Sequence, residues 1–230
     1  MRDALRPMIC VSIMGRDVSE MERKAERAVK LGGDLIELRL DFLEDLNIDQ
    51  SKELVSRFAD KAVVTLRPSW EGGRYEGREE DRMRVLDELS AENPAYMDVE
   101  LRARWLESIS EKLRKRTRLI VSSHNFSETP EVEILAAEAI RCLRYGDLAK
   151  IVVTSKTFSD NLKILKLYGR SDIPEKRLIA FAMGKRGVVS RILSPLLGSP
   201  IAYACLPGEE VASGQLSLQD FKEILRMVVR

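Results

Sequence analysis

The sequence predicts an α/β fold, a single-domain (β/α)8 TIM barrel spanning residues 1–230. Short apolar runs alternate with longer amphipathic stretches along the chain, and this alternation indicates parallel strands joined by crossover helices. The runs are almost continuously apolar, which is typical of strands covered on both faces. Eight such units in 230 residues fit a closed barrel. A doubly wound open sheet is the structural alternative, because periodicity alone does not show closure.

The predicted strands are separated by segments with helical spacing. A helix is expected at 18–31, and Gly32 and Gly33 end it because glycine tolerates the left-handed conformation found at helix ends. Apolar residues also recur with helical spacing in 132–143 and 218–225. No Pro- or Gly-rich linker divides the chain, so one domain is expected. The predicted strands are residues 8–14, 34–40, 62–66, 95–100, 119–123, 149–154, 178–183 and 201–205.

The composition excludes several classes of protein. Hydrophobic residues make up 44% and charged residues 33%, which argues against a disordered or fibrous chain. The net charge is +1 without a basic block, so no nucleic-acid partner is expected. No signal peptide or membrane-spanning run is apparent, and the unpaired Cys10, Cys142 and Cys205 indicate reduced thiols in a cytoplasmic protein.

Metal and cofactor sites are not predicted. A single histidine with scattered cysteines does not supply the usual transition-metal ligands, although clustered carboxylates could hold Mg2+. The chain lacks a G-x-G-x-x-G motif after a strand and a P-loop. We therefore expect no metal, no dinucleotide and no other cofactor.

The end of the second predicted strand carries three charged residues. Glu37, Arg39 and Asp41 follow a two-residue spacing, so they are expected on one side, away from the intervening leucines. In a parallel barrel this end of each strand carries the catalytic residues. The alternative interpretation is a structural ion-pair network, since charges inside a barrel are costly unless paired.

The third and fourth predicted strands end in the same way. Arg67 and Glu71 precede a glycine-rich tract at 72–77, which is expected to let the loop backbone approach a ligand. An ordinary flexible loop is the alternative. Asp98 and Glu100 lie on one face of the fourth strand, where charge pairing with the arginines is the competing interpretation.

The fifth and sixth strands supply a base and an amine. His124, the only histidine, ends an apolar strand and can take and return a proton near neutral pH. Lys150 lies inside an apolar run, where desolvation and nearby cations favour a neutral, nucleophilic amine. The alternative is a structural lysine paired with Asp98 or Glu100. Lys156 falls in a polar loop and is the weaker candidate.

The last two units add an anion site. Met183 ends the seventh strand, and Arg191 follows early in the next helix, where a basic group indicates an anion-binding site. A surface loop is the alternative. Gln215 precedes the last helix and is either a site residue or a helix-start residue. A lysine nucleophile, one histidine and several arginines point to a Schiff-base lyase or aldolase acting on a small anion.

The order and spacing of these motifs resemble type I 3-dehydroquinate dehydratase, nearly from end to end. The resemblance is carried by V-S-I-M-G (Ser12), E-L-R-L-D (Glu37, Arg39), T-L-R-P-S-W-E-G-G (Arg67, Glu71), M-D-V-E (Asp98, Glu100), S-S-H-N-F with T-P (His124, Phe126), A-K-I (Lys150), M-G with S-R (Met183, Arg191) and G-Q (Gln215).

The resemblance implies a dehydration of 3-dehydroquinate to 3-dehydroshikimate in the shikimate pathway by syn elimination, and a homodimer. Lys150 would form an imine with the C3 ketone, and His124 would remove the C2 proton and later protonate the departing C1 hydroxyl. Glu71 would orient His124, and Arg191 would bind the substrate carboxylate. The remaining implied substrate contacts are Ser12, Glu37, Arg39, Arg67 and Gln215.

One departure from the family concerns the segment before the last helix. The family reads S-A-P-G-Q there, whereas this chain reads V-A-S-G-Q. Val211 takes the place of a substrate-contacting serine, which leaves open whether Ser213 replaces that contact. The chain also lacks the longer N-terminal extension of some members, so a minimal barrel is expected.

Two other functions compete with this interpretation. One is another lysine Schiff-base barrel, such as a class I aldolase. The other is a non-catalytic binding protein that retains the barrel. The first differs in its product and the second in failing to form a covalent adduct, so both are open to direct test.

Overall fold

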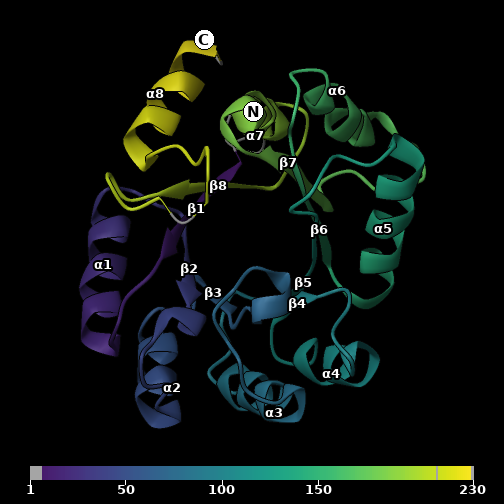
Figure 1. The fold of residues 1–230 in the computed structure, drawn as a ribbon. Coiled ribbons are helices and arrows are strands. Elements are labelled where there is room, and N and C mark those ends of the chain that lie inside the picture. Colours follow the sequence, from purple (N-terminus) through teal and green to yellow (C-terminus); the bar gives the residue numbers. More distant parts are fainter. Residues whose placement is uncertain (1–6, 211, 229–230) are drawn as a thin grey trace.

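The computed structural model describes residues 7–210 and 212–228. Strands alternate with helices throughout, as Figure 1 shows. The strands are β1 (Met8–Ile13), β2 (Leu35–Arg39), β3 (Ala62–Thr65), β4 (Tyr96–Glu100), β5 (Arg118–His124), β6 (Leu148–Thr154), β7 (Leu178–Met183) and β8 (Ile201–Cys205). The main helices are α1 (Val18–Lys30), α2 (Ile48–Arg57), α3 (Glu79–Ser90), α4 (Leu106–Leu113), α5 (Val132–Tyr145), α6 (Asp160–Leu165), α7 (Val188–Leu196) and α8 (Leu218–Val228).

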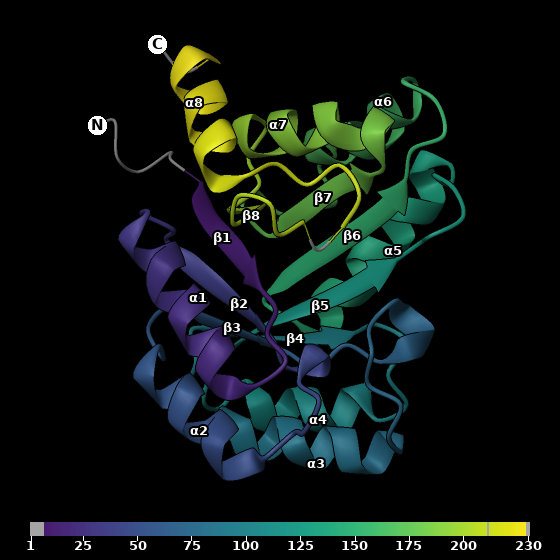
Figure 2. The ribbon, with the colours of Figure 1, turned by 60° about the vertical axis from the view of Figure 1, so that its left-hand side comes forward.

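The eight strands form one sheet in the order β7-β6-β5-β4-β3-β2-β1-β8. All seven neighbouring pairs are parallel. The two end strands, β7 and β8, lie next to each other in both ribbon views, so the sheet curls into a nearly closed barrel with the helices outside (Figure 1, Figure 2). The predicted (β/α)8 barrel is confirmed, and the open doubly wound sheet is wrong.

Most predicted element bounds hold within one residue. The predictions for β7 and β8 match the structure, and α1 ends at Lys30 rather than at residue 31. Asp17 caps this helix by accepting a hydrogen bond from the Glu20 backbone N–H at 2.7 Å, as expected of an N-cap aspartate. Gly32 follows with φ +82°, the left-handed conformation that glycine was predicted to supply.

The second strand differs from its prediction. It ends at Arg39, and Leu40–Phe42 form a 3-10 turn. Asp41 therefore does not continue the inward alternation of Glu37 and Arg39. Its carboxylate instead accepts two hydrogen bonds from the Arg39 guanidinium, at 2.9 and 2.8 Å.

The barrel interior is layered, and this layering positions the site. A plug of buried apolar side chains fills the lower half, among them Leu35, Val63, Ile120 and Leu148. Because strand side chains alternate, the next inward position on each of these strands lies two residues later. Those positions, and the ones above them, are mostly polar. A second apolar core lies between the strands and the helices. Within residues 7–210 and 212–228, no helix joins enough length with enough apolar character to span a membrane.

Candidate active site

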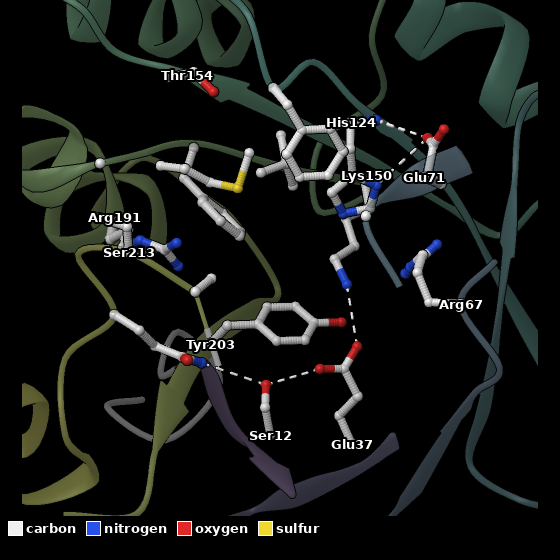
Figure 3. A pocket seen from close by; sticks show the side chains of 18 of the residues that line it. Ser12, Glu37, Arg67, Glu71, His124, Lys150, Thr154, Arg191, Tyr203 and Ser213 are labelled. Atoms are coloured by element: carbon white, nitrogen blue, oxygen red, sulfur yellow. Dashed lines mark hydrogen bonds and ion pairs between the residues drawn. The ribbon is translucent and has the colours of Figure 1, made fainter. Parts of the chain in front are cut away.

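A cavity of about 410 Å³ opens at the C-terminal ends of the strands. Its wall contains all nine side chains for which the resemblance implied a catalytic or substrate-binding role, together with Phe126, Met183 and Ser213, whereas Asp98 and Glu100 do not line it. Side chains separated by up to 203 positions in the chain thus converge on one space (Figure 3). The predicted residues in the wall are Ser12, Glu37, Arg39, Arg67, Glu71, His124, Lys150, Arg191 and Gln215.

Lys150 lies on the floor of this cavity. It follows Leu148 of the apolar plug and is 4% exposed. Its Nζ lies 3.0 Å from Asp98 Oδ2 and 3.3 Å from Glu37 Oε1. The nearest charged groups are thus carboxylates, not the cations expected from the sequence. The predicted pairing with Asp98 is present, whereas the Glu100 carboxylate bonds to two arginines instead.

A buried charge network stands beside the lysine. Arg67 donates to Asp98 at 2.8 Å, to Glu100 at 2.6 Å and to the Ser122 hydroxyl at 2.7 Å. Burial raises the pKa of Asp98, but the charges of Arg67 and Lys150 outweigh it and hold that pKa well below its usual range. Arg82 on α3 also reaches Glu100, at 2.5 Å. The predicted ion-pair network therefore exists, and it supports the floor on which Lys150 lies.

A second chain of hydrogen bonds connects β1, β2 and the segment before α8. The Ser12 hydroxyl donates to Glu37 Oε2 at 2.7 Å, and Gln215 Nε2 donates to Ser12 Oγ at 3.3 Å. Burial raises the pKa of Glu37, but the nearby Lys150 and Arg39 outweigh it, so the net pKa is lowered. Glu37 is therefore an anion that accepts from both Ser12 and Lys150, as the dashed lines of Figure 3 show.

His124 ends β5, one inward position above the level of Lys150 on the neighbouring strand. Ser122 pairs with Lys150 in the sheet register, and His124 pairs with Val152. Burial lowers the pKa of His124 to about 4, and the positive charge of Arg67 acts in the same direction. The imidazole is therefore neutral at neutral pH and has a lone pair with which to accept a proton.

Glu71 holds the segment that carries His124. Its Oε1 accepts a hydrogen bond from the His124 backbone N–H at 2.9 Å and lies 3.5 Å from the imidazole Nδ1. Within the described residues Nδ1 has no hydrogen-bond partner in the resting site. Arg102 donates to the other oxygen of Glu71 at 2.5 Å. Burial raises the pKa of Glu71, but its contacts with His124 and Arg102 outweigh it and lower the pKa.

Arg191 faces the cavity from the first turn of α7. It is 5% exposed, and burial lowers its pKa to about 10. Its Nε has no hydrogen-bond acceptor among the residues that the structure describes, and no ion pair is formed there. The guanidinium carbon lies 4.4 Å from the centroid of the Phe181 ring. A buried, unpaired arginine is poised to bind an anion.

Two loops cover the mouth. In the glycine-rich tract, Gly72 adopts φ +74° and packs against the Phe126 ring, while Gly73 packs against the Arg67 backbone. These glycines are needed for close packing within the protein, and the approach of the loop backbone to a ligand stays a prediction. On the other side, Ser213 accepts from the Gly184 backbone N–H at 3.0 Å through its carbonyl and lines the cavity. Val211 lies outside the described residues.

Sequence reasoning missed four neighbours of the site. Tyr203 and Phe181 appeared to be ordinary strand apolar residues, yet both line the cavity. Arg82 and Arg102 appeared to be surface charges, and only the barrel curvature brings them to Glu100 and Glu71. Lys156 does not line the cavity. In the described part of the chain, no three His, Cys, Asp or Glu side chains are grouped to hold a metal ion.

Comparisons with known proteins agree on one family. The family model described as type I 3-dehydroquinase matches residues 9–229. The 3-dehydroquinate dehydratase of Methanococcus maripaludis strain S2 is 34% identical over 224 residues, which covers 96% of this chain and 100% of that protein. The 3-dehydroquinate dehydratase of Dehalococcoides mccartyi strain 195 is 35% identical over 224 residues, with 96% of each chain covered.

Solved structures resemble the fold over nearly its whole length. The 3-dehydroquinate dehydratase of Geobacillus kaustophilus superposes with a TM-score of 0.87 at 27% identity, covering 97% of this chain and 91% of that one. A type I 3-dehydroquinate dehydratase from Clostridium difficile, solved with covalently modified comenic acid, also gives 0.87 at 27% identity, covering 97% of this chain and 92% of that one.

Proposed function

The chain belongs to the type I 3-dehydroquinase family and is a carbon–oxygen lyase that dehydrates 3-dehydroquinate to 3-dehydroshikimate in the shikimate pathway; from that premise we propose that Lys150 is the amine that captures the substrate ketone. One observation carries this proposal. Among the described residues that line the cavity, Lys150 is the one lysine, and it is buried on the floor. A covalent role is also in keeping with the covalently modified ligand of the Clostridium difficile structure.

The first stage forms the imine. An ammonium has no lone pair, so Lys150 gives up a proton before it attacks; Asp98 and Glu37 are its nearest acceptors, at 3.0 and 3.3 Å. The amine adds to the C3 carbonyl carbon, and the resulting carbinolamine loses water to give an iminium ion. Neutral His124 takes a proton released by the Lys150 nitrogen and passes it to the departing hydroxyl, so the imidazole is neutral again once the iminium has formed. The positive nitrogen then acts as an electron sink, which acidifies the proton at C2.

The second stage is the elimination. Neutral His124 removes the C2 proton, and the C2–H electron pair moves toward the iminium nitrogen to form an enamine. The electrons then return and expel the C1 hydroxyl, which leaves as water after taking the proton from the His124 imidazolium. Because one imidazole serves both steps, both leaving atoms lie on one face of the ring, which gives syn elimination. Water then hydrolyses the product imine and frees Lys150.

The remaining side chains bind and orient the substrate. Arg191 pairs with the carboxylate at C1, because it is a buried cation without an anionic partner in the described chain. Glu37, Arg39, Arg67, Ser12 and Gln215 contact the ring hydroxyls, and Glu71 orients His124. Ser213 lines the same cavity as Arg191 and is the candidate for the hydroxyl contact that Val211 does not supply (Figure 3).

We further propose that two copies of the chain associate and that the enzyme works in the cytoplasm. Exposed apolar side chains occur on α6 and α7, just before α6 and just after α7, which suits an interface. Light scattering that finds a monomer at micromolar concentration would exclude the dimer. The three cysteines are free and buried, which suits a reducing compartment and is checked by cell fractionation. The apolar side chains are Phe158, Leu162, Val189, Leu193, Leu196 and Leu197.

Borohydride trapping tests the role of Lys150. The enzyme is incubated with 3-dehydroquinate and borohydride, and the reduced adduct is located by mass spectrometry. We expect the adduct on Lys150, none in Lys150→Ala, and a normal yield in the control Lys156→Ala, whose lysine lies outside the cavity. Lys150→Ala should also lose nearly all turnover, followed by the near-ultraviolet absorbance of the conjugated enone.

The same experiment separates the competing functions. A class I aldolase would form the adduct without the rise in enone absorbance, and a binding protein would show neither. An adduct on any other lysine would refute the assignment of Lys150.

A further inference from the structure

Two aromatic rings lie beneath the cations of the cavity. Tyr203 on β8 and Phe181 on β7 have ring centroids 6.1 Å apart. Lys150 Nζ lies 4.1 Å from the centroid of the Tyr203 ring, and the Arg191 guanidinium carbon lies 4.4 Å from that of Phe181. In Figure 3 the Tyr203 side chain reaches the end of Lys150. Lys150 and Arg191 thus each face one aromatic ring.

The ring and the carboxylates hold the Lys150 nitrogen in different ways. An ammonium has three N–H donors, two of which point to Asp98 and Glu37 in the resting site. The iminium keeps a single N–H, so at least one of these hydrogen bonds is lost when the Schiff base forms. Attraction to an aromatic face needs positive charge and no N–H, so it persists from the ammonium to the iminium.

We propose that Tyr203 is a positioning residue of the Schiff-base step, and that its ring face keeps the cationic nitrogen of Lys150 at the cavity floor after the carboxylate contacts are reduced. The inference rests on Lys150 being the imine-forming amine. The negative face of the ring favours the iminium over the neutral carbinolamine, so it acts on imine formation rather than on substrate capture.

The hydroxyl of Tyr203 has no part in this role. It is buried and has no hydrogen-bond partner among residues 7–210 and 212–228. Burial, helped by the negative charge of Glu37, raises its pKa well above the usual value, so it stays a neutral phenol. Removing this oxygen leaves the ring in place and breaks no hydrogen bond within the described chain.

A series of variants at position 203 tests the ring. Tyr203→Phe keeps the face, Tyr203→Leu removes it, and Tyr203→4-fluorophenylalanine and Tyr203→3,4,5-trifluorophenylalanine weaken its negative charge at nearly constant volume. We expect kcat and the rate of borohydride trapping to stay within about 3-fold of wild type in Tyr203→Phe, to fall about 3- to 30-fold in Tyr203→Leu, and to fall stepwise with fluorination. KM should change little.

Phe181→Leu is the matched control, because it removes the other ring of the pair, the one that faces Arg191. It should raise KM and leave trapping at saturating substrate near normal. An equal loss in Tyr203→Phe and Tyr203→Leu would assign the role to the hydroxyl, and a flat fluorination series would overturn the ring proposal. If wild type itself formed no adduct, the proposed function would fail instead. Because the fluorinated variants keep the ring at nearly constant volume, they test the proposal even if Tyr203→Leu does not fold.

Discussion

Buried charges form ion pairs in one half of the cavity, whereas a buried arginine lacks one in the other half. On the side of β2 to β6, Glu37, Arg67, Asp98 and Lys150 all have oppositely charged partners at 3.3 Å or less. On the side of β7, β8 and α7, Arg191 is equally buried but has no ion pair within the described chain. We refer to these as the paired half and the unpaired half. The paired half forms a rigid frame, and the unpaired half leaves one charge for the ligand.

This difference follows from the cost of burying ions. A buried charge is tolerated when an opposite charge and hydrogen bonds compensate it. Removal of one partner then leaves the other as an uncompensated buried charge. The Arg191 guanidinium lacks such a partner, and its lowered pKa, about 10, reflects that burial. A substrate carboxylate would supply the missing charge. The free energy lost by burying Arg191 during folding would then be recovered on binding.

The largest expected effect is in the paired half. Arg67→Met removes the common partner of Asp98 and Glu100, so the free energy of unfolding should fall by about 3–5 kcal/mol. Guanidinium chloride unfolding measures this. Arg84→Met is the control, because Arg84 is exposed and its one ion pair within the described residues is with Asp81; the loss of stability should stay below about 1 kcal/mol. Equal losses in the two variants would contradict the idea of a buried frame.

The second effect should have the opposite pattern. Arg191→Met removes an unpaired charge, so the free energy of unfolding should stay unchanged or rise. The KM for 3-dehydroquinate should rise roughly 10- to 100-fold, because hydrogen bonds to charged groups contribute about 1.5–3 kcal/mol. Steady-state kinetics and guanidinium chloride unfolding give both quantities. Arg191→Lys keeps the charge and loses the bidentate fork, so an intermediate KM is expected. If Arg191→Met lowered the free energy of unfolding and left KM normal, Arg191 would have the structural role of the paired half.

The sequence predicted the paired half better than the unpaired half. Charged residues at two-residue spacing, such as Glu37 with Arg39 and Asp98 with Glu100, stand out in apolar strands, and the alternation of strand side chains brings them inward. Phe181 and Tyr203 carry no such signal, because an aromatic residue in a strand is usually core. Their contacts depend on how the barrel curls. The same holds for Arg82, which comes from a helix with many charged residues, three of them in its first turn.

The contact between Arg102 and Glu71 at the barrel mouth could not be predicted from the sequence either. Arg102 lies just after β4, in a segment where three of five residues from 100 to 104 are charged. Nothing in that pattern selects Arg102 over Arg104. The β3–α3 loop folds back so that Glu71 contacts Arg102 and not Arg104.

The smallest expected effect concerns the contact between Arg102 and Glu71 and the pH dependence of kcat/KM. Because the pKa of His124 is lowered to about 4 from 6.5, the imidazole stays a competent base in mildly acidic solution, and the acidic limb of kcat/KM should lie below pH 6. Between pH 6.5 and 4 the histidine is therefore protonated in the unfolded chain but not in the folded protein. Stability from this group is therefore full above pH 6.5 and is lost as the pH falls toward 4.

Arg102→Gln should move that limb upward. Without the Arg102 cation, the negative charge of Glu71 acts more fully on the imidazole and favours its protonated form. Since the Arg102 side chain is 59% exposed, the interaction is screened, and a shift of about 0.2–0.7 pH units is expected, with turnover at neutral pH unchanged within about 2-fold. Arg104→Gln, which removes an exposed charge near Glu80 rather than Glu71, should leave the limb in place. A downward shift in Arg102→Gln, or an equal shift in both variants, would mean that Glu71 does not couple Arg102 to His124.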